Sequence, residues 1–331
     1  MEKICKGIQY IISGGNLKKG NILQFYNRRR LQQKINDARC DMLFAPASSE
    51  LIACGIPRSK KLIYLSDAVY YLMLNYYWFN ISEKEQSYGN ACEQKALDRA
   101  EAVIFASDWA KNGAIKYYYC DSNKIYVIPF GSNLKDKYQV RKIMGEKTHI
   151  HLLLVGVEWK RKGIDVAIDC IHLLNKWQKN FKFDLTIVGF DNPVDKNFVG
   201  DDIIFKGKLN KNNPDEYNEM IEIYQNSDIF ILPTRAECAG IVFCEAAEYG
   251  LPVVTYDTGG ISTYVENEVN GIRLPMNAGA TEFAHAVLNM IESGKMSLYV
   301  ENARRKYEKE LNWDAWRKAF DEILKDFIIK R

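Results

Sequence analysis

Several patterns that mark common classes of protein are missing from this sequence of 331 residues. No apolar run approaches the roughly 20 residues that a membrane-spanning helix needs, and the first residues lack the charged-then-apolar pattern of a signal peptide. We therefore expect a cytoplasmic protein. The eight cysteines form no C-x-x-C pair and there are only four histidines, which disfavours a zinc site and a disulfide framework. We expect reduced, mostly buried thiols and no bound metal.

Three motifs of nucleotide and ester chemistry are also missing. The absence of G-x-G-x-x-G argues against a nicotinamide oxidoreductase, and the absence of G-x-x-x-x-G-K-[ST] argues against a P-loop NTPase. No G-x-S-x-G elbow is found either. What is present is the composition of a folded globular protein, 47% hydrophobic and 26% charged without a low-complexity tract, in a chain long enough for two domains.

Positive charge is concentrated near the N-terminus. Residues 1–40 hold nine basic and two acidic side chains, a net charge of +7, so the remainder carries −4 of the overall +3. Such a segment could meet anionic lipid headgroups or phosphates, which would give a peripheral contact at the inner face of a membrane. A solvated helix face is an equally good interpretation. We expect no nucleic-acid partner.

The second half of the chain alternates short apolar runs with amphipathic stretches of helix length, the pattern of a parallel sheet with crossover helices. Near-continuous apolar strands imply burial on both faces of the sheet, and hence one doubly wound domain. The predicted strands are 150–155, 183–188, 203–206, 228–232, 252–256 and 271–274. The predicted helices are 164–177, 213–226, 239–249, 279–293 and 296–309.

The first half shows the same alternation with fewer strands. Its predicted strands are 41–45, 61–65, 102–106 and 124–128, and its predicted helices are 69–79, 87–98 and 108–118. Residues 129–148 are poor in apolar side chains and resemble a hinge. We therefore predict a first domain at 1–136 and a second at 137–312. A last helix within 313–331 carries one apolar stripe and is predicted to pack at the seam between the domains.

Ligands of open parallel sheets bind beyond the carboxyl ends of the strands, so the loops after the strands of the second half are the candidate site. These loops are 156–163, 189–197, 207–212, 233–239 and 257–262. Four of the five carry Gly, Lys, Arg or Glu in arrangements suited to a phosphorylated ligand.

The helix predicted at 239–249 begins without a capping side chain at Cys238. Its first amides, including those of Gly240 and Ile241, are therefore predicted to be free for an anion, which the helix dipole also favours. Glu237 and Glu245 would place one carboxylate on either side of a diphosphate bound there, suited to sugar or ribose hydroxyls. The alternative is a surface helix with scattered acids.

A basic run, Lys160-Arg161-Lys162-Gly163, precedes the helix predicted at 164–177. Guanidinium and ammonium groups at such a turn are well placed to neutralise a pyrophosphate. A lone basic run is usually solvated, but here a helix N-terminus is aimed at the same crevice. Gly259-Gly260 gives a turn where backbone could approach a ligand, which is weak evidence by itself.

These residues also resemble a known family. Glu237-Cys-Ala-Gly-Ile-Val-Phe-Cys-Glu245 resembles the E-x7-E signature of family 4 retaining glycosyltransferases. The likeness extends over nearly all of residues 124–312 and includes Arg161-Lys162-Gly163, Ile187-Val188-Gly189, Phe205-Lys206-Gly207, and Pro233-Thr234. In the first half, Ser66-Asp67 and Ala106-Ser107-Asp108-Trp109 look similar too. The resemblance implies an α/β fold of the GT-B type, with two Rossmann-like doubly wound domains facing a central cleft.

The resemblance also implies roles for individual residues. Arg161 and Lys162 would bind the donor diphosphate and stabilise the leaving nucleoside diphosphate. Glu237 would contact the transferred sugar, and Asp67 would meet the acceptor. Donor-binding positions would be Glu245, Gly240, Ile241, Gly156, Gly207, Lys208, Gly259 and Gly260. The sugar would transfer with retention and without an obligatory metal or other cofactor.

The sequence departs from the family pattern at several points. Val157 stands where many members have Arg, Ser66 where many have His, and Thr263 where many have Glu. The first domain is shorter than the family's, which opens with a strand, a glycine-rich loop and a helix, so we expect a truncated form. Residues 8–15 could be a remnant of that opening unit or merely a helix and loop. These departures leave the acceptor side least defined. An aromatic run from Tyr70 to Phe79 suits core packing better than an acceptor platform.

Two functions follow from these observations. The leading one is a retaining hexosyltransferase that moves a sugar from a nucleotide-sugar donor to a saccharide or lipid-linked acceptor, in cell-surface polysaccharide assembly. The alternative is a nucleotide-sugar-binding subunit that is non-catalytic or depends on a partner chain. A nucleotide-sugar epimerase fits less well, because such enzymes need acid–base groups around the sugar and histidines are scarce in the strand-end loops.

Overall fold

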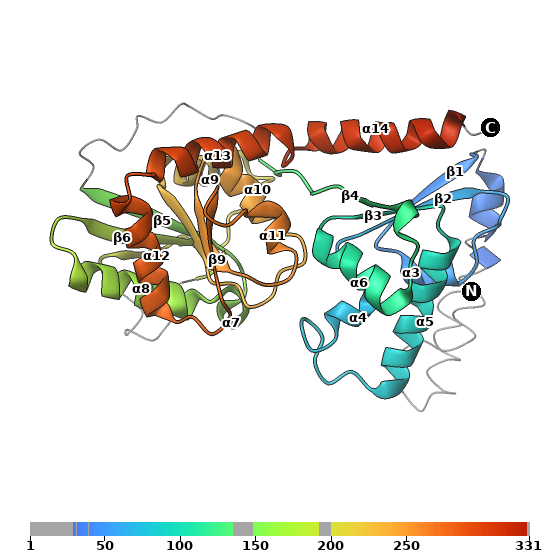
Figure 1. Cartoon of the computed structure of the whole chain (residues 1–331), viewed down its shortest axis with the longest axis horizontal. Helices are drawn as coiled ribbons and strands as arrows, with labels where there is room; N and C mark the ends of the chain where they lie inside the picture. The colour runs from blue at the N-terminus through green and yellow to red at the C-terminus, as the bar shows by residue number, and fades with distance from the viewer. Residues whose placement is uncertain (1–28, 31, 39, 135–147, 192–199, 330–331) are drawn as a thin grey trace. The chain divides into compact units, whose positions relative to one another are not determined.

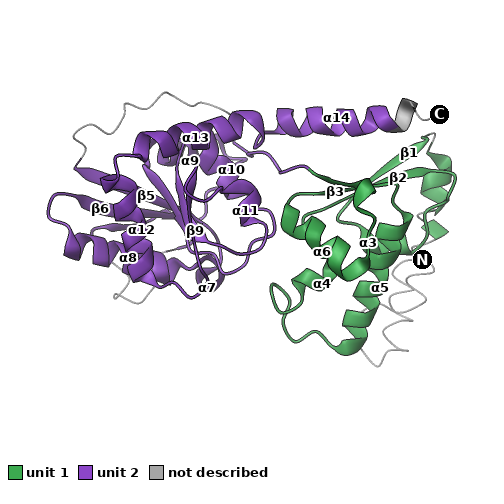
Figure 2. Cartoon of the chain, viewed as in Figure 1, with its two compact units in different colours: residues 1–127 green, residues 128–331 purple. Residues whose placement is uncertain are grey.

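A computed structural model describes residues 29–30, 32–38, 40–134, 148–191 and 200–329. The chain divides into two compact units, residues 1–127 and 128–331 (Figure 2). The domain boundary predicted at 136/137 and most of the basic segment 1–40 lie outside the described residues. Each unit is an α/β structure built on a parallel sheet (Figure 1).

Unit 1 contains a four-stranded parallel sheet in the order β1-β2-β3-β4. Its strands are β1 (Met42–Pro46), β2 (Lys61–Ser66), β3 (Ala102–Phe105) and β4 (Ile125–Val127). β3 is buried along its whole length, as expected of a central strand covered on both faces. All four predicted strands are confirmed to within one residue at each end. The described strands lie in the sheet in the same order as along the chain, so this part of the sheet has no point at which the strand order reverses.

The helices of unit 1 are α3 (Ser49–Ala53), α4 (Tyr70–Met73), α5 (Glu83–Arg99) and α6 (Asp108–Tyr118), with a 3-10 turn η1 (Ser122–Lys124). Local capping signals fix the two long helices. Ser82 and Glu85 form a reciprocal capping box at the start of α5, and the Ser107 hydroxyl accepts from the Ala110 amide at the start of α6. Such caps stabilise a helix by about 1 kcal/mol each.

The helix predicted over 69–79 is wrong beyond its first turn. α4 ends at Met73, because Leu74 adopts an extended conformation and Asn75 a left-handed one with φ of 55°. The amide of Asn75 then donates to the carbonyl of Trp78 at 2.8 Å. The aromatic spacing imitates a helical stripe, whereas the backbone folds back in a turn.

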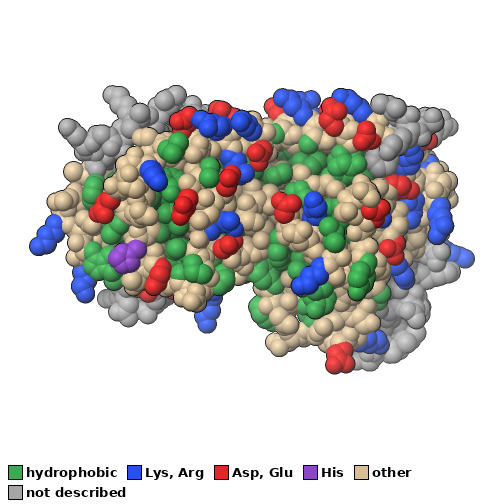
Figure 3. Space-filling model, in the orientation of Figure 1, with side chains coloured by type: hydrophobic (Ala, Val, Ile, Leu, Met, Phe, Trp, Pro, Cys, Tyr) green, Lys and Arg blue, Asp and Glu red, His purple; other side chains and the backbone are tan. Residues whose placement is uncertain are grey.

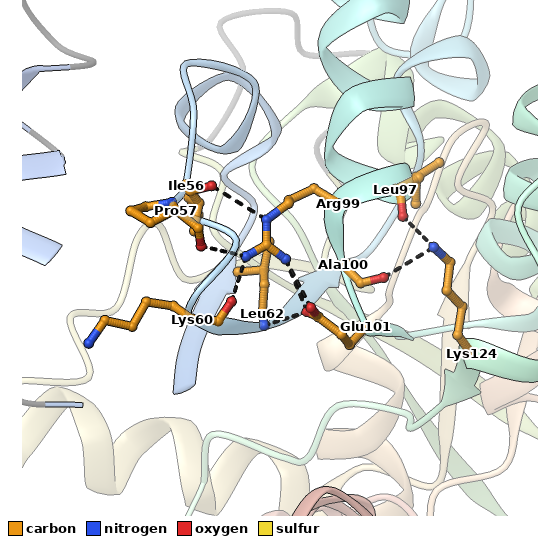
Figure 4. A network of polar contacts seen from close by, with 9 residues as sticks. All are labelled: Ile56, Pro57, Lys60, Leu62, Leu97, Arg99, Ala100, Glu101 and Lys124. Carbon is orange, nitrogen blue, oxygen red and sulfur yellow. Dashed lines mark hydrogen bonds and ion pairs between the residues drawn. The ribbon is translucent and has the colours of Figure 1, made fainter. Parts of the chain in front are cut away.

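A polar network ties the amino ends of β2 and β3 together (Figure 4). The Arg99 guanidinium donates to the carbonyl oxygens of Pro57 at 2.8 Å and Lys60 at 2.5 Å, and it pairs with Glu101 at 3.1 Å. Glu101 in turn accepts from the Leu62 amide at 2.6 Å. Arg99 therefore satisfies backbone carbonyls of the segment that enters β2, which makes this network a structural one at the end of the sheet away from Asp67.

Unit 2 contains a six-stranded parallel sheet in the order β10-β9-β8-β5-β6-β7. Its strands are β5 (His149–Val155), β6 (Lys182–Val188), β7 (Ile203–Phe205), β8 (Ile229–Leu232), β9 (Val253–Tyr256) and β10 (Gly271–Leu274). All six predicted strands are confirmed to within one residue. This is the strand order of a dinucleotide-binding Rossmann sheet. From β5 the chain first adds strands on one side, β6 and β7, and then on the other side, β8 to β10, so the switch point lies between β5 and β8.

The helices of unit 2 are α7 (Trp159–Lys162), α8 (Ile164–Trp177), α9 (Pro214–Asn226), α10 (Ile241–Glu248), α11 (Ile261–Tyr264), α12 (Ala280–Glu292), α13 (Met296–Lys309) and α14 (Trp313–Ile329). α8 packs beside α12, and α10 packs beside α13. α8 connects β5 to β6, and α10 connects β8 to β9 in the opposite direction along the sheet. Because both connections are expected to be right-handed, the two helix pairs lie on opposite faces of the sheet. The predicted doubly wound domain is therefore present in unit 2.

The C-terminal helix α14 is tied to unit 2 at its first turn. The rings of Trp313 and Phe130 stack with centroids 6.0 Å apart, and a Cβ at Gly131 would lie 2.4 Å from the Trp313 amide nitrogen. Farther along, Trp316 and Phe320 stack on the same stripe at 5.0 Å. Packing of this helix at a seam between domains stays a prediction.

The seven cysteines in the described part of the chain are all free thiols, and five of them are buried. Burial raises the pKa of the Cys170 and Cys244 thiols above the ordinary value, which makes them unreactive. The expectation of mostly buried thiols is thus confirmed for these residues, and their reduced state stays a prediction. On the face drawn in Figure 3, Lys and Arg side chains are interspersed with Asp and Glu.

Within the described residues, no helix combines the length and the hydropathy needed to cross a bilayer.

Candidate functional site

The reversal of strand order in unit 2 makes β5 and β8 neighbours, and the loops that leave their carboxyl ends meet. Gly163, between α7 and α8, has a left-handed φ of 66°. A Cβ at this position would lie 2.1 Å from the Pro233 carbonyl oxygen, in the loop after β8. The amide of Arg235 also donates to the Arg161 carbonyl at 2.7 Å. Two loops far apart in sequence are therefore locked together at the switch point of the sheet, where α/β proteins bind ligands.

Lys162 and Glu237 form the centre of this site. The Lys162 ammonium lies 2.5 Å from a Glu237 carboxylate oxygen, and their side chains are only 8% and 11% exposed. Gly156, the first residue after β5, leaves room for this lysine, because a Cβ there would lie 2.7 Å from the Lys162 Cγ. Predicted residues Gly156, Lys162 and Glu237 are thus brought together.

Arg161 adds a second cation beside the same carboxylate. Its Nη1 lies 3.8 Å from Glu237 and donates to the Ala236 carbonyl at 3.1 Å. Its Nη2 donates to Glu158 at 2.7 Å, and this hydrogen bond holds the pKa of the Glu158 carboxyl below its ordinary value. Two cations therefore share one buried carboxylate, and the exposed Glu158 balances the second cation. An anionic ligand that replaces Glu158 at Arg161 would find both cations in place.

Glu245 forms a second acidic position on α10. Its side chain is 2% exposed, it accepts from the Tyr224 hydroxyl at 3.0 Å, and it is ion-paired with Lys211. Burial, followed by the Glu245 charge, raises the pKa of Tyr224 well above the ordinary value, so this phenol stays a hydrogen-bond donor. The carboxylate is oriented by two donors and can still accept from ligand hydroxyls through its remaining lone pairs.

Sequence reasoning missed Lys211 and Tyr224. The sequence pointed to Lys208 in the loop after β7, but the lysine that meets Glu245 is Lys211, in the same loop, while Lys208 is exposed. The sequence does identify this loop as a strand end. Which of its lysines turns inward depends on its path between β7 and α9, and no local pattern encodes that path.

α10 begins two residues later than predicted, and one amide that was predicted to be free is hydrogen-bonded. Ile241 is the first helical residue, and its amide donates to the Ala239 carbonyl at 2.9 Å. The predicted free amide at Ile241 is therefore wrong in this structure, because a tight turn before the helix supplies its partner. Gly240 is the N-cap, and a Cβ there would lie 2.2 Å from the Phe243 ring. Packing alone thus requires this glycine.

The remaining predicted glycines line other strand ends of the same sheet. Gly207, after β7, has a φ of 65°, and its carbonyl accepts from the Gly189 amide at 2.6 Å. Gly259 has a φ of 55°. The amide of Gly260 donates to the Glu237 carbonyl at 3.0 Å, which fixes the backbone of the central acid. Gly259 and Gly260 therefore support Glu237, and direct contact with a ligand stays a prediction.

Asp67 belongs to unit 1. It is exposed, it directly follows β2, and it lines a cavity of that unit. It thus lies at the carboxyl end of its own sheet, as the predicted acceptor residue would. Its role stays a prediction.

One group of side chains in the described part of the chain has the geometry to hold a metal ion. His149, His151 and Asp184 place a ligand atom each within 4.8 Å of one another. Both histidines are on β5 and contact the Asp184 carboxylate of β6 at 2.7 and 2.8 Å. They lie toward the amino ends of the strands, whereas Lys162 and Glu237 follow the carboxyl ends. The metal-free expectation stays a prediction.

Comparison with known proteins agrees with this architecture. Residues 149–293 match the family model described as "Glycosyl transferases group 1". The chain is 25% identical over 190 residues to D-inositol 3-phosphate glycosyltransferase of Paenarthrobacter aurescens, covering 54% of this chain and 46% of the relative. It is 26% identical over 231 residues to lipopolysaccharide glucosyltransferase WaaG of Escherichia coli, covering 63% and 58%.

A solved structure of sucrose-phosphate synthase from Thermosynechococcus elongatus superposes with a TM-score of 0.70 at 18% identity, covering 92% of this chain and 78% of that one. The α/β fold with two parallel sheets is that of GT-B glycosyltransferase structures, which confirms the predicted fold class. The chain spans about half the length of the curated relatives it matches. The truncation of the first domain and membership of family 4 stay predictions.

Proposed function

We propose, from the group 1 glycosyltransferase domain at residues 149–293, that this protein transfers a sugar from a nucleotide-sugar donor to a saccharide or lipid-linked acceptor. The observation that carries the proposal is the buried cluster at the β5–β8 switch point, where Lys162 and Arg161 face Glu237. It combines cations for a diphosphate with a carboxylate for sugar hydroxyls at the place where a Rossmann sheet binds nucleotides.

The cluster can act on the leaving group. As the bond between the sugar and the diphosphate breaks, negative charge grows on the diphosphate, and two preorganised cations stabilise it in a site shielded from water. Because these cations already stand where a metal would neutralise the diphosphate, we propose metal-independent transfer. When the donor binds, the diphosphate replaces Glu237 as the partner of the Lys162 ammonium, and the Glu237 carboxylate moves toward the sugar.

Glu245 selects the nucleoside part of the donor. Its carboxylate is buried and held by Tyr224 and Lys211, so it can accept two vicinal hydroxyls of a ribose without reorganising. Transfer with retention of configuration, and a hexose as the sugar, follow from the resemblance of residues 237–245 to retaining enzymes. One relative named above is described as a lipopolysaccharide glucosyltransferase, which supports a role in cell-surface polysaccharide or glycoconjugate assembly. We place that assembly at the cytoplasmic face of a membrane, with residues 1–40 as its contact.

A screen of nucleotide sugars with and without EDTA tests the proposal. We expect one donor to bind with slow, EDTA-insensitive hydrolysis, and a Glu245→Gln variant to raise the donor KM about 10- to 100-fold, since a hydrogen bond to a charged group contributes about 1.5–3 kcal/mol. Glu301→Gln, an exposed exchange on α13, serves as the matched control and should behave as the parent protein.

The outcomes discriminate between the two functions. Donor binding without hydrolysis or transfer would favour the non-catalytic or partner-dependent subunit. A fully active Glu245→Gln variant, or loss of activity in EDTA, would contradict the roles assigned here.

A further inference from the structure

Unit 1 contains a cavity of about 650 Å³ at the carboxyl end of β2, walled by α3, α4 and α5. Its volume lies in the range of small-molecule sites, and its position is where parallel sheets bind ligands. Asp67 stands in its wall. The following inference rests on the proposed function, because it assigns the acceptor to this cavity.

The charge of the wall is one-sided. Four acidic side chains line the cavity, those of Glu50, Asp67, Glu85 and Glu93, whereas no Lys, Arg or His lines it among the described residues. Burial raises the pKa of Glu93 to about 7, so the negative charge near neutral pH comes chiefly from the other three. An anion entering this space would meet like charge at short range, and each such contact is unfavourable where water is partly excluded. Among the described residues, the wall therefore has no cation that could bind a phosphate as Lys162 and Arg161 are proposed to do in unit 2.

The rest of the wall is suited to a sugar ring. Tyr70 packs against Gly89 of α5, in line with the packing role predicted for the aromatic run. Trp78 departs from that prediction, because it is 39% exposed and lines the cavity beside Tyr70, with ring centroids 5.0 Å apart and tilted planes. Aromatic faces stack on the apolar C–H face of a pyranose, while carboxylates accept its equatorial hydroxyls. Aromatic rings together with acceptor-only groups match a polyhydroxylated, uncharged ligand.

The floor of the cavity is rigid. Tyr64 is 1% exposed and its hydroxyl donates at 3.0 Å to the carboxylate of Glu93, which is 3% exposed. The Ser66 hydroxyl donates to the Ala68 carbonyl at 2.7 Å, which fixes the turn that contains Asp67. Glu93 is thus a positioning residue for Tyr64.

We propose that this cavity binds the terminal sugar of an uncharged saccharide acceptor, with Trp78 stacked on the ring and Asp67 hydrogen-bonded to a hydroxyl. Because no cation lines the cavity among the described residues, phosphorylated sugars are disfavoured as acceptors. This distinguishes the chain from a relative that is named for an inositol phosphate.

Binding and turnover on the full chain test this inference separately. Saturation-transfer NMR without donor uses methyl glycosides of glucose, galactose, mannose and N-acetylglucosamine. Glucose 1-phosphate and glucose 6-phosphate are the anionic probes, and they are scored by how well they displace the bound glycoside, because a phosphate held by the cations of unit 2 leaves the unit 1 cavity unoccupied. We expect at least one glycoside to bind and both phosphates to displace it at least tenfold more weakly than a second glycoside does. In turnover assays, Trp78→Ala should raise the acceptor KM about tenfold through loss of stacking, with donor KM and donor hydrolysis unchanged.

A charge reversal provides the second variant. Glu50→Lys should narrow or invert the preference for uncharged over phosphorylated sugar, while Glu83→Lys, the same change at an exposed residue that does not line the cavity, should not. Equal displacement of the bound glycoside by phosphates and by a second glycoside, or glycoside binding that neither Trp78→Ala nor Glu50→Lys alters, would overturn the inference. Because glycoside binding is measured without donor, its failure is distinguishable from failure of the donor site.

Discussion

Glu93 carries the most informative titration among the described residues. Burial raises the pKa of its carboxyl from 4.5 to about 7, against smaller opposing contributions from the Tyr64 and Ser49 hydroxyls and the Tyr70 amide. The folded chain therefore binds more protons than the unfolded chain between pH 4.5 and 7. Stability is lost as the pH rises through this window, because the buried carboxyl must ionise.

This raised pKa predicts a measurable pH dependence. Across pH 4.5–7 the unfolding free energy contributed by this group should fall by about 3 kcal/mol, since a pKa that differs by one between the folded and unfolded chain corresponds to about 1.4 kcal/mol. Glu93→Gln carries no charge and should lose this slope, so denaturant unfolding of the two proteins should diverge with pH. Glu83→Gln is the exposed control. Curves of parent and Glu93→Gln that stay parallel would show that the carboxyl is not buried as described.

At the scale of elements, the short connection between α7 and α8 decides where the cations of the site lie. Lys162 ends α7 and Gly163 reverses the backbone in the left-handed region, so that α8 can begin at once. Glycine is needed twice over at this position: a side chain would strain the backbone, and it would also meet the Pro233 carbonyl at 2.1 Å.

Gly163→Ala combines these two effects, and a matched control separates them. We expect a loss of about 3 kcal/mol or more in unfolding free energy, together with weaker donor binding, because relief of the clash pushes apart the loops that carry Lys162 and Glu237. Gly294→Ala is the control, since Gly294 has a φ of 70° with no atom within 4 Å of the added Cβ. It should cost only the backbone strain, about 1 kcal/mol. Equal losses in the two variants would contradict a tight loop contact.

At the scale of the whole molecule, each unit has a hydrophobic core of its own. The core of unit 1 centres on residues such as Leu97 and Phe105, and that of unit 2 on residues such as Leu153 and Phe230. Separate cores make separate cooperative units the natural expectation for unfolding.

Calorimetry should therefore resolve two transitions. Leu97→Ala, which opens a cavity in a fully buried site of unit 1, should lower only one of them. The donor at about 100 times its Kd should raise only the other, by about 5–10 °C, since ligand binding then adds about 2.7 kcal/mol. A single transition, or an equal rise of both, would show that the two units unfold as one.

Much of the architecture could be predicted from local sequence. The ten strands of the described residues all match the sequence-based bounds to within one residue, because buried parallel strands are short, nearly continuous apolar runs. α8 and α13 match their predicted bounds at both ends. The family resemblance also predicted that Glu237 and Glu245 belong to the donor site. Both acids are buried and ion-paired in unit 2, and their contact with a donor stays a prediction.

Other features could not be predicted from local patterns. α3, α7 and α11 have only four or five residues, which is too short to show helical periodicity. The helix predicted over 69–79 failed for the opposite reason, since its aromatic spacing is helical while Asn75 adopts a left-handed conformation. The hydrogen bond at Ile241 depends on a turn that residue types alone do not specify.

The sequence by itself determined the α/β class, the strands, most long helices and the loops that carry the candidate chemistry, since these depend on neighbours along the chain. Only the tertiary structure decided the side-chain partners. Lys162 pairs with Glu237 across 75 residues and Lys211 with Glu245 across 34. Both pairs form because β8 lies beside β5, on the side opposite to β6 and β7. Local preferences fix which strands form, whereas the packing of the whole sheet fixes their order and hence which charges meet.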